Sequence, residues 1–372
     1  MNTHSISRRK FAHLLGIGAA AAIVRPRISI AKESITVPAP AKAGVVRLSA
    51  NENPYGPSAK AHEAMKNTHG VCNRYPDEAN DVLIDKIAKL NNINRDQIVL
   101  GDGSSEILKL CAETFTGPAQ GKLVVADPTF EAILEYSKAC GADVVKVPLT
   151  SNYAHDLEKM GSSAQKGLIY ICNPNNPTAS ITPKNDLQAF IEKTSPETMI
   201  LVDEAYFHYA DSPEYESVIP LVKDHPNLIV ARTFSKIYGM AGLRAGFVMG
   251  RPDLLAKLRP YGVGFMPVTG LACATASLRV KELVSERRAI NKRRREDVFA
   301  FLEKKGVKYI PSQTNFFMME VGRPGNEFAD AMAREKVIIG RIWQSWPTKV
   351  RVSIGNDEEM AKFKSAFEKV WA

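Results

Sequence analysis

Cysteine is scarce in this 372-residue chain: it has five, an odd number, and none belongs to a Cys-x-x-Cys pair. No cysteines and histidines stand at the spacing of zinc ligands, so the sequence argues against a disulfide framework and against a structural metal site. The chain also lacks a Gly-x-Gly-x-x-Gly motif after its first expected strand with an acidic residue about 20 positions further on. A nicotinamide-dependent dehydrogenase is therefore not expected.

Acidic residues are absent from the first 31 positions, which contain five arginines and lysines. The formal net charge of the whole chain is +9, so this short segment carries more than half of the excess. The remaining chain has a weak positive balance and no basic stripe interleaved with aromatic residues. These features argue against a nucleic-acid partner.

A long hydrophobic run is missing as well. The apolar stretch at residues 14–24 is too short to span a bilayer core of about 30 Å as a helix. Ser-Arg-Arg-Lys-Phe at residues 7–11 precedes it, and small residues at 29–31 follow. This order resembles a twin-arginine signal peptide, which predicts export by the twin-arginine machinery to the periplasm without a stable membrane anchor. The alternative is a cytoplasmic protein with a basic start and a short buried helix.

Short β-rich runs alternate with helical stretches from about residue 41 onward. Most of these runs are continuously apolar, as in strands of a parallel-rich sheet that is covered on both faces. Helices are expected between them, for example at 104–115 and 130–140, which is typical of α/β architecture. The charged segment 282–305 predicts a long amphipathic helix with a solvated basic face. Strands are expected at 97–101, 122–127, 144–148, 168–172, 199–203, 228–232 and 246–249.

Polar residues stand at or beyond the ends of several expected strands, where open α/β sheets bind ligands. Gly-Asp-Gly-Ser-Ser-Glu at 101–106 opens a helix and could hold a phosphate at its N-terminus. Asp203 closes a buried strand, where a carboxylate needs a cationic partner or a capping role. Lys236 follows another strand, although such a lysine can also extend to solvent.

Taken in order, the motifs of this chain resemble those of fold-type-I pyridoxal-phosphate (PLP) enzymes, specifically the histidinol-phosphate aminotransferase-like branch. The resemblance covers roughly residues 45–360. It implies a mixed, mostly parallel seven-stranded sheet flanked by helices, with a smaller discontinuous α+β domain. The motifs are LSANENPYGP (48–57), RYP (74–76), GDGSSE (101–106), DPTF (127–130), NPNNPT (173–178), DEAY (203–206), TFSK (233–236), GLRAG (242–246) and VRVSIG (350–355).

The expected domain boundaries combine this resemblance with the N-terminal pattern. A signal peptide at 1–31 and a linker at 32–44 precede an N-terminal arm at 45–72, which also contributes to the small domain. A large PLP-binding domain is expected at 73–280, and the C-terminal small domain at 281–372.

The resemblance implies a role for each residue around the cofactor ring. Lys236 would carry PLP as a Schiff base and move the α-proton, which a lysine does well once burial and nearby positive charge lower its pKa. Asp203 would pair with the pyridine nitrogen and keep it protonated. Asn176 and Tyr206 would hydrogen-bond the phenolic oxygen of the ring, with Tyr206 counted among the catalytic residues. Phe130 would stack on the ring face.

The phosphate of PLP would be held by hydroxyls and one guanidinium. Tyr75 would reach the phosphate of the neighbouring subunit, which implies a homodimer with shared active sites. The residues expected around the phosphate are Ser104, Ser105, Thr233, Ser235 and Arg244.

The substrate would be held mainly by arginine. Arg351 would take its α-carboxylate in a two-pronged grip, and Arg341 could bind a distal acid or phosphate. Asn53 and Tyr55 of the N-terminal motif are further expected substrate contacts. No metal is expected.

The predicted function is PLP-dependent transfer of an amino group between an amino acid, or a related primary amine, and a 2-oxo acid. A PLP decarboxylase resembling threonine-phosphate decarboxylase is the alternative enzyme, because both reactions would use Lys236, Asp203 and Arg244. A PLP-binding protein without turnover is a third hypothesis, which the presence of the lysine, the aspartate and Arg351 weakens.

Overall fold

The computed structural model describes residues 44–262 and 264–371. The expected signal peptide and nearly all of the expected linker lie outside the described residues. Within the described ranges, no helix combines the length and the apolar character that are needed to cross a bilayer.

A seven-stranded sheet forms the centre of the larger lobe, in the order β2-β8-β7-β6-β5-β3-β4. β8 runs antiparallel to both of its neighbours, and the other pairs are parallel. The expected fold class is confirmed. The strands are β2 (Ile98–Gly101), β3 (Lys122–Asp127), β4 (Val144–Pro148), β5 (Gly167–Cys172), β6 (Thr198–Asp203), β7 (Leu228–Thr233) and β8 (Gly246–Gly250).

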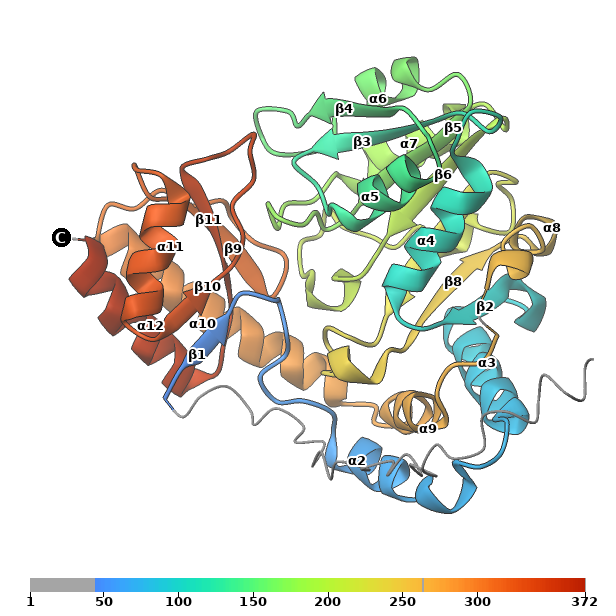
Figure 1. The fold of residues 1–372 in the computed structure, drawn as a ribbon, viewed down its shortest axis with the longest axis horizontal. Coiled ribbons are helices and arrows are strands. Elements are labelled where there is room, and N and C mark those ends of the chain that lie inside the picture. Colours follow the sequence, from blue (N-terminus) through green and yellow to red (C-terminus); the bar gives the residue numbers. More distant parts are fainter. Residues whose placement is uncertain (1–43, 263, 372) are drawn as a thin grey trace, which may run out of the picture. The chain divides into compact units, whose positions relative to one another are not determined.

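Both faces of this sheet are covered, which explains why its strands are continuously apolar. Every residue of β5 and β6 is buried. Alternate residues enter two separate cores: Ile169 and Val202 join one, and Leu168 and Leu201 join the other. Figure 1 shows α4 (Ser104–Phe115) and α5 (Ala132–Ala139) over one face, where both contribute to the second core.

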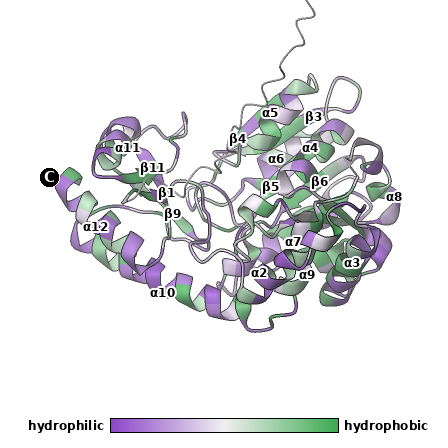
Figure 2. Cartoon of the chain, turned by 60° about the horizontal axis from the view of Figure 1, so that its bottom comes forward, coloured by the Kyte–Doolittle hydropathy of each residue, from purple (hydrophilic) through white to green (hydrophobic). Residues whose placement is uncertain are grey.

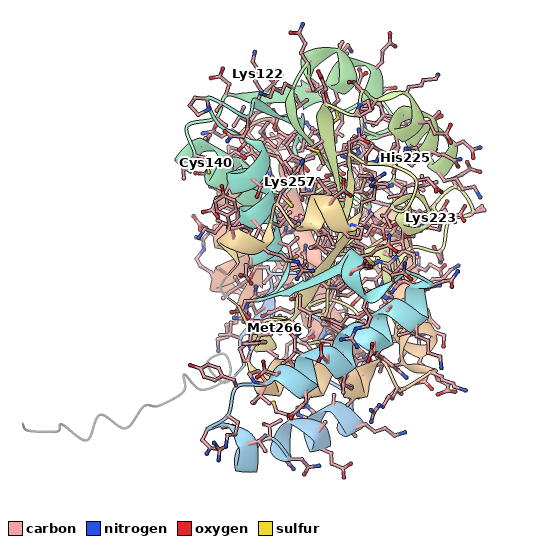
Figure 3. The ribbon with its side chains drawn as sticks, turned by 90° about the vertical axis from the view of Figure 1, so that its right-hand side faces the viewer. Lys122, Cys140, Lys223, His225, Lys257 and Met266 are labelled. Atoms are coloured by element: carbon pink, nitrogen blue, oxygen red, sulfur yellow. The ribbon has the colours of Figure 1, made fainter. Side chains whose placement is uncertain are left out.

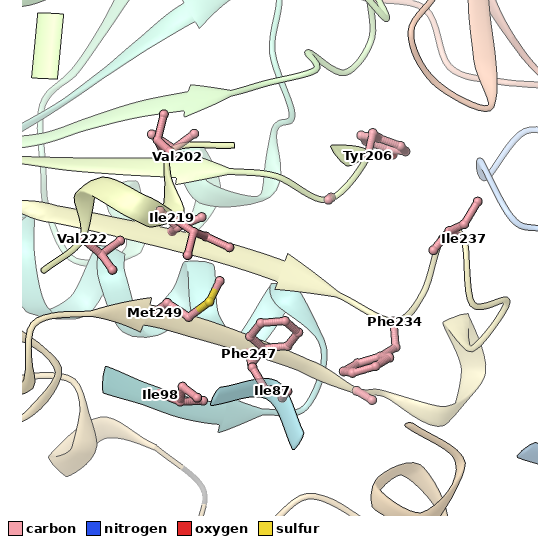
Figure 4. Close-up of a cluster of buried hydrophobic side chains, with 14 of the residues drawn as sticks. Ile87, Ile98, Val202, Tyr206, Ile219, Val222, Phe234, Ile237, Phe247 and Met249 are labelled. Atoms are coloured by element: carbon pink, nitrogen blue, oxygen red, sulfur yellow. The ribbon is translucent and has the colours of Figure 1, made fainter. Parts of the chain in front are cut away.

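The other face carries the first core, part of which is shown in Figure 4. Ile87 reaches it from α3, Val202 from the sheet, and Phe247 and Met249 from β8. Helices that contribute to this core include α2 (Ala59–Lys66), α3 (Asp77–Asn91), α7 (Lys184–Lys193) and α9 (Val268–Ser277).

A smaller lobe combines the two ends of the described chain. β1 (Val46–Leu48) pairs in parallel with β10 (Val337–Ile339), and β9 (Phe316–Glu320) pairs antiparallel with β11 (Lys349–Ser353). The segment that follows β1 is thereby tied to the C-terminal lobe. The helices of this lobe are α10 (Leu283–Lys304), α11 (Gly325–Arg334) and α12 (Asp357–Trp371).

Short elements complete the described chain. The remaining helices are α6 (Leu157–Ser163) and α8 (Pro252–Leu255), and the 3-10 turns are η1 (His69–Val71), η2 (Arg95–Gln97), η3 (Phe207–Tyr209), η4 (Ile219–Leu221), η5 (Ala241–Leu243) and η6 (Arg259–Tyr261).

Helix α10 differs from its expected form in one respect. Figure 2 shows it as mainly hydrophilic, yet Arg287, Arg294 and Arg295 are buried. Arg287 donates to the carbonyl oxygens of Ile237 (2.8 Å) and Gly56 (2.7 Å), so part of its basic run stabilises neighbouring loops. The expectation of a solvated basic face is therefore wrong for these three arginines, and the backbone carbonyl partners of Arg287 leave no trace in a charge pattern.

All five cysteines are free thiols. Cys111, Cys172 and Cys273 are buried, and Cys140, labelled in Figure 3, follows the last turn of α5. Burial raises the pKa of the Cys273 thiol to about 11, so this side chain behaves as a small apolar group.

Candidate functional site

A cavity of about 250 Å³ lies where the carboxyl ends of the central strands meet. β5 ends at Cys172 and β6 at Asp203, and the chain leaves β7 toward Lys236. Ligands of open α/β sheets bind at this edge. The residues that line the cavity are Ser49, Ala50, Asn51, Ser104, Ser105, Phe130, Cys172, Asn176, Asp203, Ala205, Tyr206, Ser235, Lys236, Ala241, Arg244, Arg341 and Arg351.

Lys236 lines this cavity, and its amine has a lowered pKa. Burial, followed by the positive charge of Arg351, lowers its pKa to about 8, while Asp203 acts in the opposite direction. The Nζ atom lies 3.4 Å from the carbonyl oxygen of Asn51 and 5.3 Å from the centre of the Tyr206 ring. About a tenth of this amine is therefore unprotonated at pH 7, and the unprotonated form is the one that a nucleophile or base requires.

Asp203 is buried at the end of β6, with 2% of its surface exposed. Its Oδ2 accepts a hydrogen bond from the Tyr170 hydroxyl at 2.9 Å, and its Oδ1 accepts one from the Ala205 amide at 3.1 Å. Burial raises its pKa to about 6, although these two hydrogen bonds and Lys236 oppose the rise. A cationic partner would stabilise the carboxylate further.

Hydroxyls, one helix N-terminus and one guanidinium meet at another side of the cavity. Ser104 and Ser105 open α4, whose first amide groups lack intrahelical partners. Arg244 donates to the carbonyl oxygens of Ala241 (2.9 Å) and Asp102 (3.1 Å), which orients its guanidinium. This combination suits a phosphate group.

Two supporting residues shape the same side. Gly103 precedes α4 with φ of 76°, and a Cβ atom at this position would overlap the Arg244 guanidinium. Thr233 does not line the cavity; its hydroxyl donates to Ser235 at 2.9 Å and so supports a residue that does.

Arg351 is buried, with 4% of its surface exposed, on β11 of the smaller lobe. It donates to Asn176 Oδ1 at 2.7 Å and to the Ser49 carbonyl oxygen at 2.6 Å, and its Nε has no partner. Among the described residues it forms no ion pair, and burial lowers its pKa to about 10. A buried guanidinium without a carboxylate is costly, so the site favours an incoming anion.

Asn176 and Tyr206 are both close to these groups. Because Asn176 Oδ1 accepts from Arg351, its amide NH₂ remains available as a donor toward the cavity. The Tyr206 hydroxyl accepts from Asn51 Nδ2 at 3.1 Å, and burial raises the pKa of Tyr206 above its ordinary value. Both side chains can therefore donate to an oxygen of a ligand.

Besides Thr233, three of the expected site residues do not line this cavity. Tyr75 is 84% exposed. Asn53 donates to the carbonyl oxygen of Ile237 at 3.0 Å, and the Tyr55 ring faces the guanidinium of Arg294 at 5.2 Å. Asn53 and Tyr55 border a second, smaller cavity beside α10.

Sequence reasoning missed three residues of the site. Asn51 lines the cavity, Tyr170 contacts Asp203, and Glu131 forms an ion pair with Arg341 at 2.9 Å. Tyr170 had a usable signal: it is the one residue with a hydroxyl in the otherwise apolar run 168–172, and a buried tyrosine hydroxyl usually has a partner. Asn51 and Glu131 had none, because their partners are 155 and 210 residues away in sequence.

The residues present fit PLP. The cofactor needs a phosphate site, an acid at the ring nitrogen, donors at the ring oxygen and an amine, and Arg244, Asp203, Asn176 and Lys236 offer these groups around one cavity. Arg351, which pairs with no acid among the described residues, adds a site for a substrate anion beside them. In the part of the chain that the structure describes, no three His, Cys, Asp or Glu side chains gather as a metal ion would require.

Comparison with known proteins decides the family. A family model described as "Aminotransferase class I and II" matches residues 43–367. A histidinol-phosphate aminotransferase from Symbiobacterium thermophilum is 36% identical over 329 residues, which cover 87% of this chain and 90% of the relative. The chain belongs to the class I and II aminotransferases.

Solved structures agree with this family. The histidinol-phosphate aminotransferase from Sinorhizobium meliloti, in complex with pyridoxal-5'-phosphate, has a TM-score of 0.81 at 26% identity and covers 88% of this aminotransferase and 90% of its own chain. L-threonine-O-3-phosphate decarboxylase from Porphyromonas gingivalis has a TM-score of 0.73 at 20% identity, and the match covers 87% of this aminotransferase and 99% of the decarboxylase chain. The latter shows a shared fold alone. This aminotransferase is therefore a PLP-dependent enzyme that transfers amino groups.

Proposed function

We propose that this aminotransferase moves an amino group between an amino acid and a 2-oxo acid, with Lys236 as the residue that binds the cofactor and shuttles the Cα proton. The observation that carries the proposal is the meeting of three groups at one cavity: the lysine amine, the Asp203 carboxylate and the Arg351 guanidinium. They come from two lobes and from segments far apart in the sequence.

Each of these groups has a distinct task. Arg351 binds the α-carboxylate of the substrate, since its fork of donors matches a carboxylate and no acid of the described chain pairs with it. Asp203 holds a proton on the ring nitrogen. Bound PLP supplies a sink for the electron pair that remains at Cα after the proton leaves.

Lys236 would accept the Cα proton as a free amine and would later donate a proton as an acid. Its pKa of about 8 suits both directions, because neither protonation state is strongly disfavoured near neutral pH. Tyr206 and Asn176 donate to the ring oxygen, while Arg244, Ser104, Ser105 and Ser235 hold the phosphate.

Reduction of the purified holoenzyme with borohydride tests the proposal. The cofactor should become irreversibly attached to the peptide that contains Lys236, as detected by mass spectrometry. Attachment to another lysine, or no attachment, would contradict it. Incubation with single amino acids should also yield 2-oxo acids, and release of CO₂ in their place would indicate a decarboxylase.

We also propose a homodimer with shared active sites. Tyr75 is 84% exposed and lies next to Phe265, which is 44% exposed, with 6.5 Å between their ring centres. Tyr261 and Val71 are further exposed apolar side chains of the same lobe. Large exposed aromatic residues favour a protein interface, and the Tyr75 hydroxyl is then free to reach the phosphate of the partner subunit.

A third proposal concerns location: the twin-arginine machinery exports this aminotransferase to the periplasm. Its support is the sequence of residues 7–31, in which the arginine pair precedes a short apolar run. Replacing Arg8 and Arg9 with lysine should leave folded, uncleaved protein in the cytoplasm, as cell fractionation would show. Undiminished periplasmic protein in this double variant would count against the route.

A further inference from the structure

An ion pair stands at the rim of the active-site cavity. Arg341 lines the cavity from the segment between β10 and β11, and its guanidinium lies 2.9 Å from Glu131 Oε2. Glu131 immediately precedes α5 and follows Phe130, which is part of the cavity wall. The pair therefore connects the smaller lobe to the larger one beside the space for the substrate.

The other cations of the cavity already have tasks in the proposed function. Arg244 faces the phosphate side, Lys236 holds the cofactor, and Arg351 takes the α-carboxylate. Among the described residues that line the cavity, Arg341 is the remaining cation. Because Glu131 balances its charge, the cavity keeps no unmatched cation for a second anionic group of a substrate.

The influence of this pair extends to Arg351. Burial has the largest effect on the pKa of Arg351, but Arg341 also lowers this pKa and Glu131 raises it. Both side chains thus act electrostatically on the group that binds the α-carboxylate. Exposed fractions of 57% for Arg341 and 44% for Glu131 make the pair weak and open to exchange.

We propose that Glu131 is a specificity residue: by occupying Arg341, it directs the enzyme toward amino acids whose side chains are uncharged and away from those with a distal carboxylate or phosphate. The inference rests on the proposed function, because it assumes that the substrate enters this cavity with its α-carboxylate at Arg351. A distal anion must displace Glu131 from Arg341 and then remain beside its negative charge.

The test compares L-glutamine with L-glutamate, which have similar shapes and differ in charge. The wild-type holoenzyme should convert glutamine with the higher kcat/KM. Glu131→Gln should raise kcat/KM for glutamate by about 3- to 30-fold and leave glutamine within about twofold, since an exposed ion pair is exchanged for a neutral contact. Adding Arg341→Gln should remove the gain. The control variant Glu135→Gln changes an exposed acid in α5 and should leave kcat/KM unchanged for both donors.

Binding of two unreactive acids gives a second measurement that needs no turnover. Glutarate has two carboxylates, whereas 5-methylhexanoate replaces one of them with an isopropyl group. By calorimetry, Glu131→Gln should tighten the binding of glutarate by about 3- to 30-fold and leave the affinity for 5-methylhexanoate unchanged.

Failure of this inference can be told apart from failure of the proposed function. A wild-type preference for glutamate, or an equal effect of Glu131→Gln on both donors and both acids, would overturn the specificity role. If neither donor reacts with any variant, the proposed function is in question, and the glutarate measurement still decides whether Glu131 repels a second anion.

Discussion

Arg351 shows how a single residue joins stability to function. A buried guanidinium that donates to an amide and a carbonyl, but to no carboxylate, is maintained at a cost that a substrate anion can offset. Its neighbours are supplied by both lobes, so its environment depends on the assembled chain.

We expect Arg351→Ala to slow the reaction with an amino acid by about 30- to several-thousand-fold, the effect of about 2–5 kcal/mol for losing one side of a buried charged pair. The visible absorbance of the bound cofactor should persist, because Lys236, Asp203 and Arg244 remain. Arg351→Lys should rescue activity only partly, since an ammonium group cannot form the planar two-pronged contact. Near-normal activity of Arg351→Ala would move the carboxylate site elsewhere, with Arg341 as the next candidate.

Lys236 should destabilise the cofactor-free protein at neutral pH. Its pKa is lowered from 10.5 to about 8, so between these values the unfolded chain binds a proton that the folded chain does not. The free energy of unfolding of the cofactor-free wild-type protein therefore rises as the pH increases from about 8 to 10.5. Below pH 8 the folded protein carries the full cost of burying the charged amine.

Replacement of this lysine by an apolar residue should remove this destabilisation of the cofactor-free protein. In the cofactor-free protein at pH 7, Lys236→Met should increase the free energy of unfolding by about 1–3 kcal/mol. This magnitude follows from the pKa shift of Lys236. It is smaller than the full shift implies, because the substitution also removes a cationic neighbour of Asp203. Denaturant titrations at several pH values should show this advantage shrinking above pH 8. A difference that stays constant from pH 6 to 10.5 would contradict the lowered pKa.

Among the elements, the turn that leads from β2 into α4 leaves little room for a side chain. Gly103 has a positive φ, and its missing side chain leaves room for the Arg244 guanidinium. The turn thereby places a helix N-terminus and a cation on the same side of the cavity. The helix itself occupies Ser104–Phe115, as expected from the sequence.

Gly103→Ala should displace Arg244 and strain the turn. We expect the dissociation constant of PLP to rise by about 10- to 100-fold, since a charge-assisted hydrogen bond contributes about 1.5–3 kcal/mol. Equilibrium dialysis or quenching of tyrosine and tryptophan fluorescence would measure this change. Gly242→Ala is the matched control, because a Cβ there meets nothing within 4 Å. Equal cofactor affinities for the two variants would show that the turn tolerates a side chain.

At the scale of the whole molecule, the proposed dimer makes each active site depend on two chains. A hybrid of one Tyr75→Ala subunit and one Lys236→Ala subunit should contain one complete site, with Lys236 from the first subunit and Tyr75 from the second. Mixing and refolding the two weakly active or inactive variants should therefore restore up to about a quarter of the wild-type activity, because random pairing makes half of the dimers hybrid, with one complete site in each.

Size-exclusion chromatography of the mixture verifies that dimers form. An unchanged low activity in mixtures that contain hybrid dimers would exclude a shared site through Tyr75. Full activity of Tyr75→Ala alone would show that the tyrosine is dispensable.

The sequence by itself determined the strands of the central sheet and predicted the family, but it left amino transfer and decarboxylation as alternatives. Continuous apolar runs placed the seven sheet strands within one residue of their observed bounds, because strands buried on both faces leave a strong local signal. The motif order resembled that of PLP enzymes, and this resemblance singled out Lys236, Asp203 and Arg351, because each of these residues taken alone also fits an ordinary structural role.

The tertiary structure alone decided which groups meet. Pairing of β1 with β10 ties the segment that leads to Asn51 to the C-terminal lobe, and Asn51 contacts Tyr206, 155 residues away. The Tyr170–Asp203 hydrogen bond and the Glu131–Arg341 ion pair arise in the same way. Sequence patterns record the periodicity and burial of a segment, whereas contacts between distant segments depend on how the elements pack, so these partners became visible only in the folded chain.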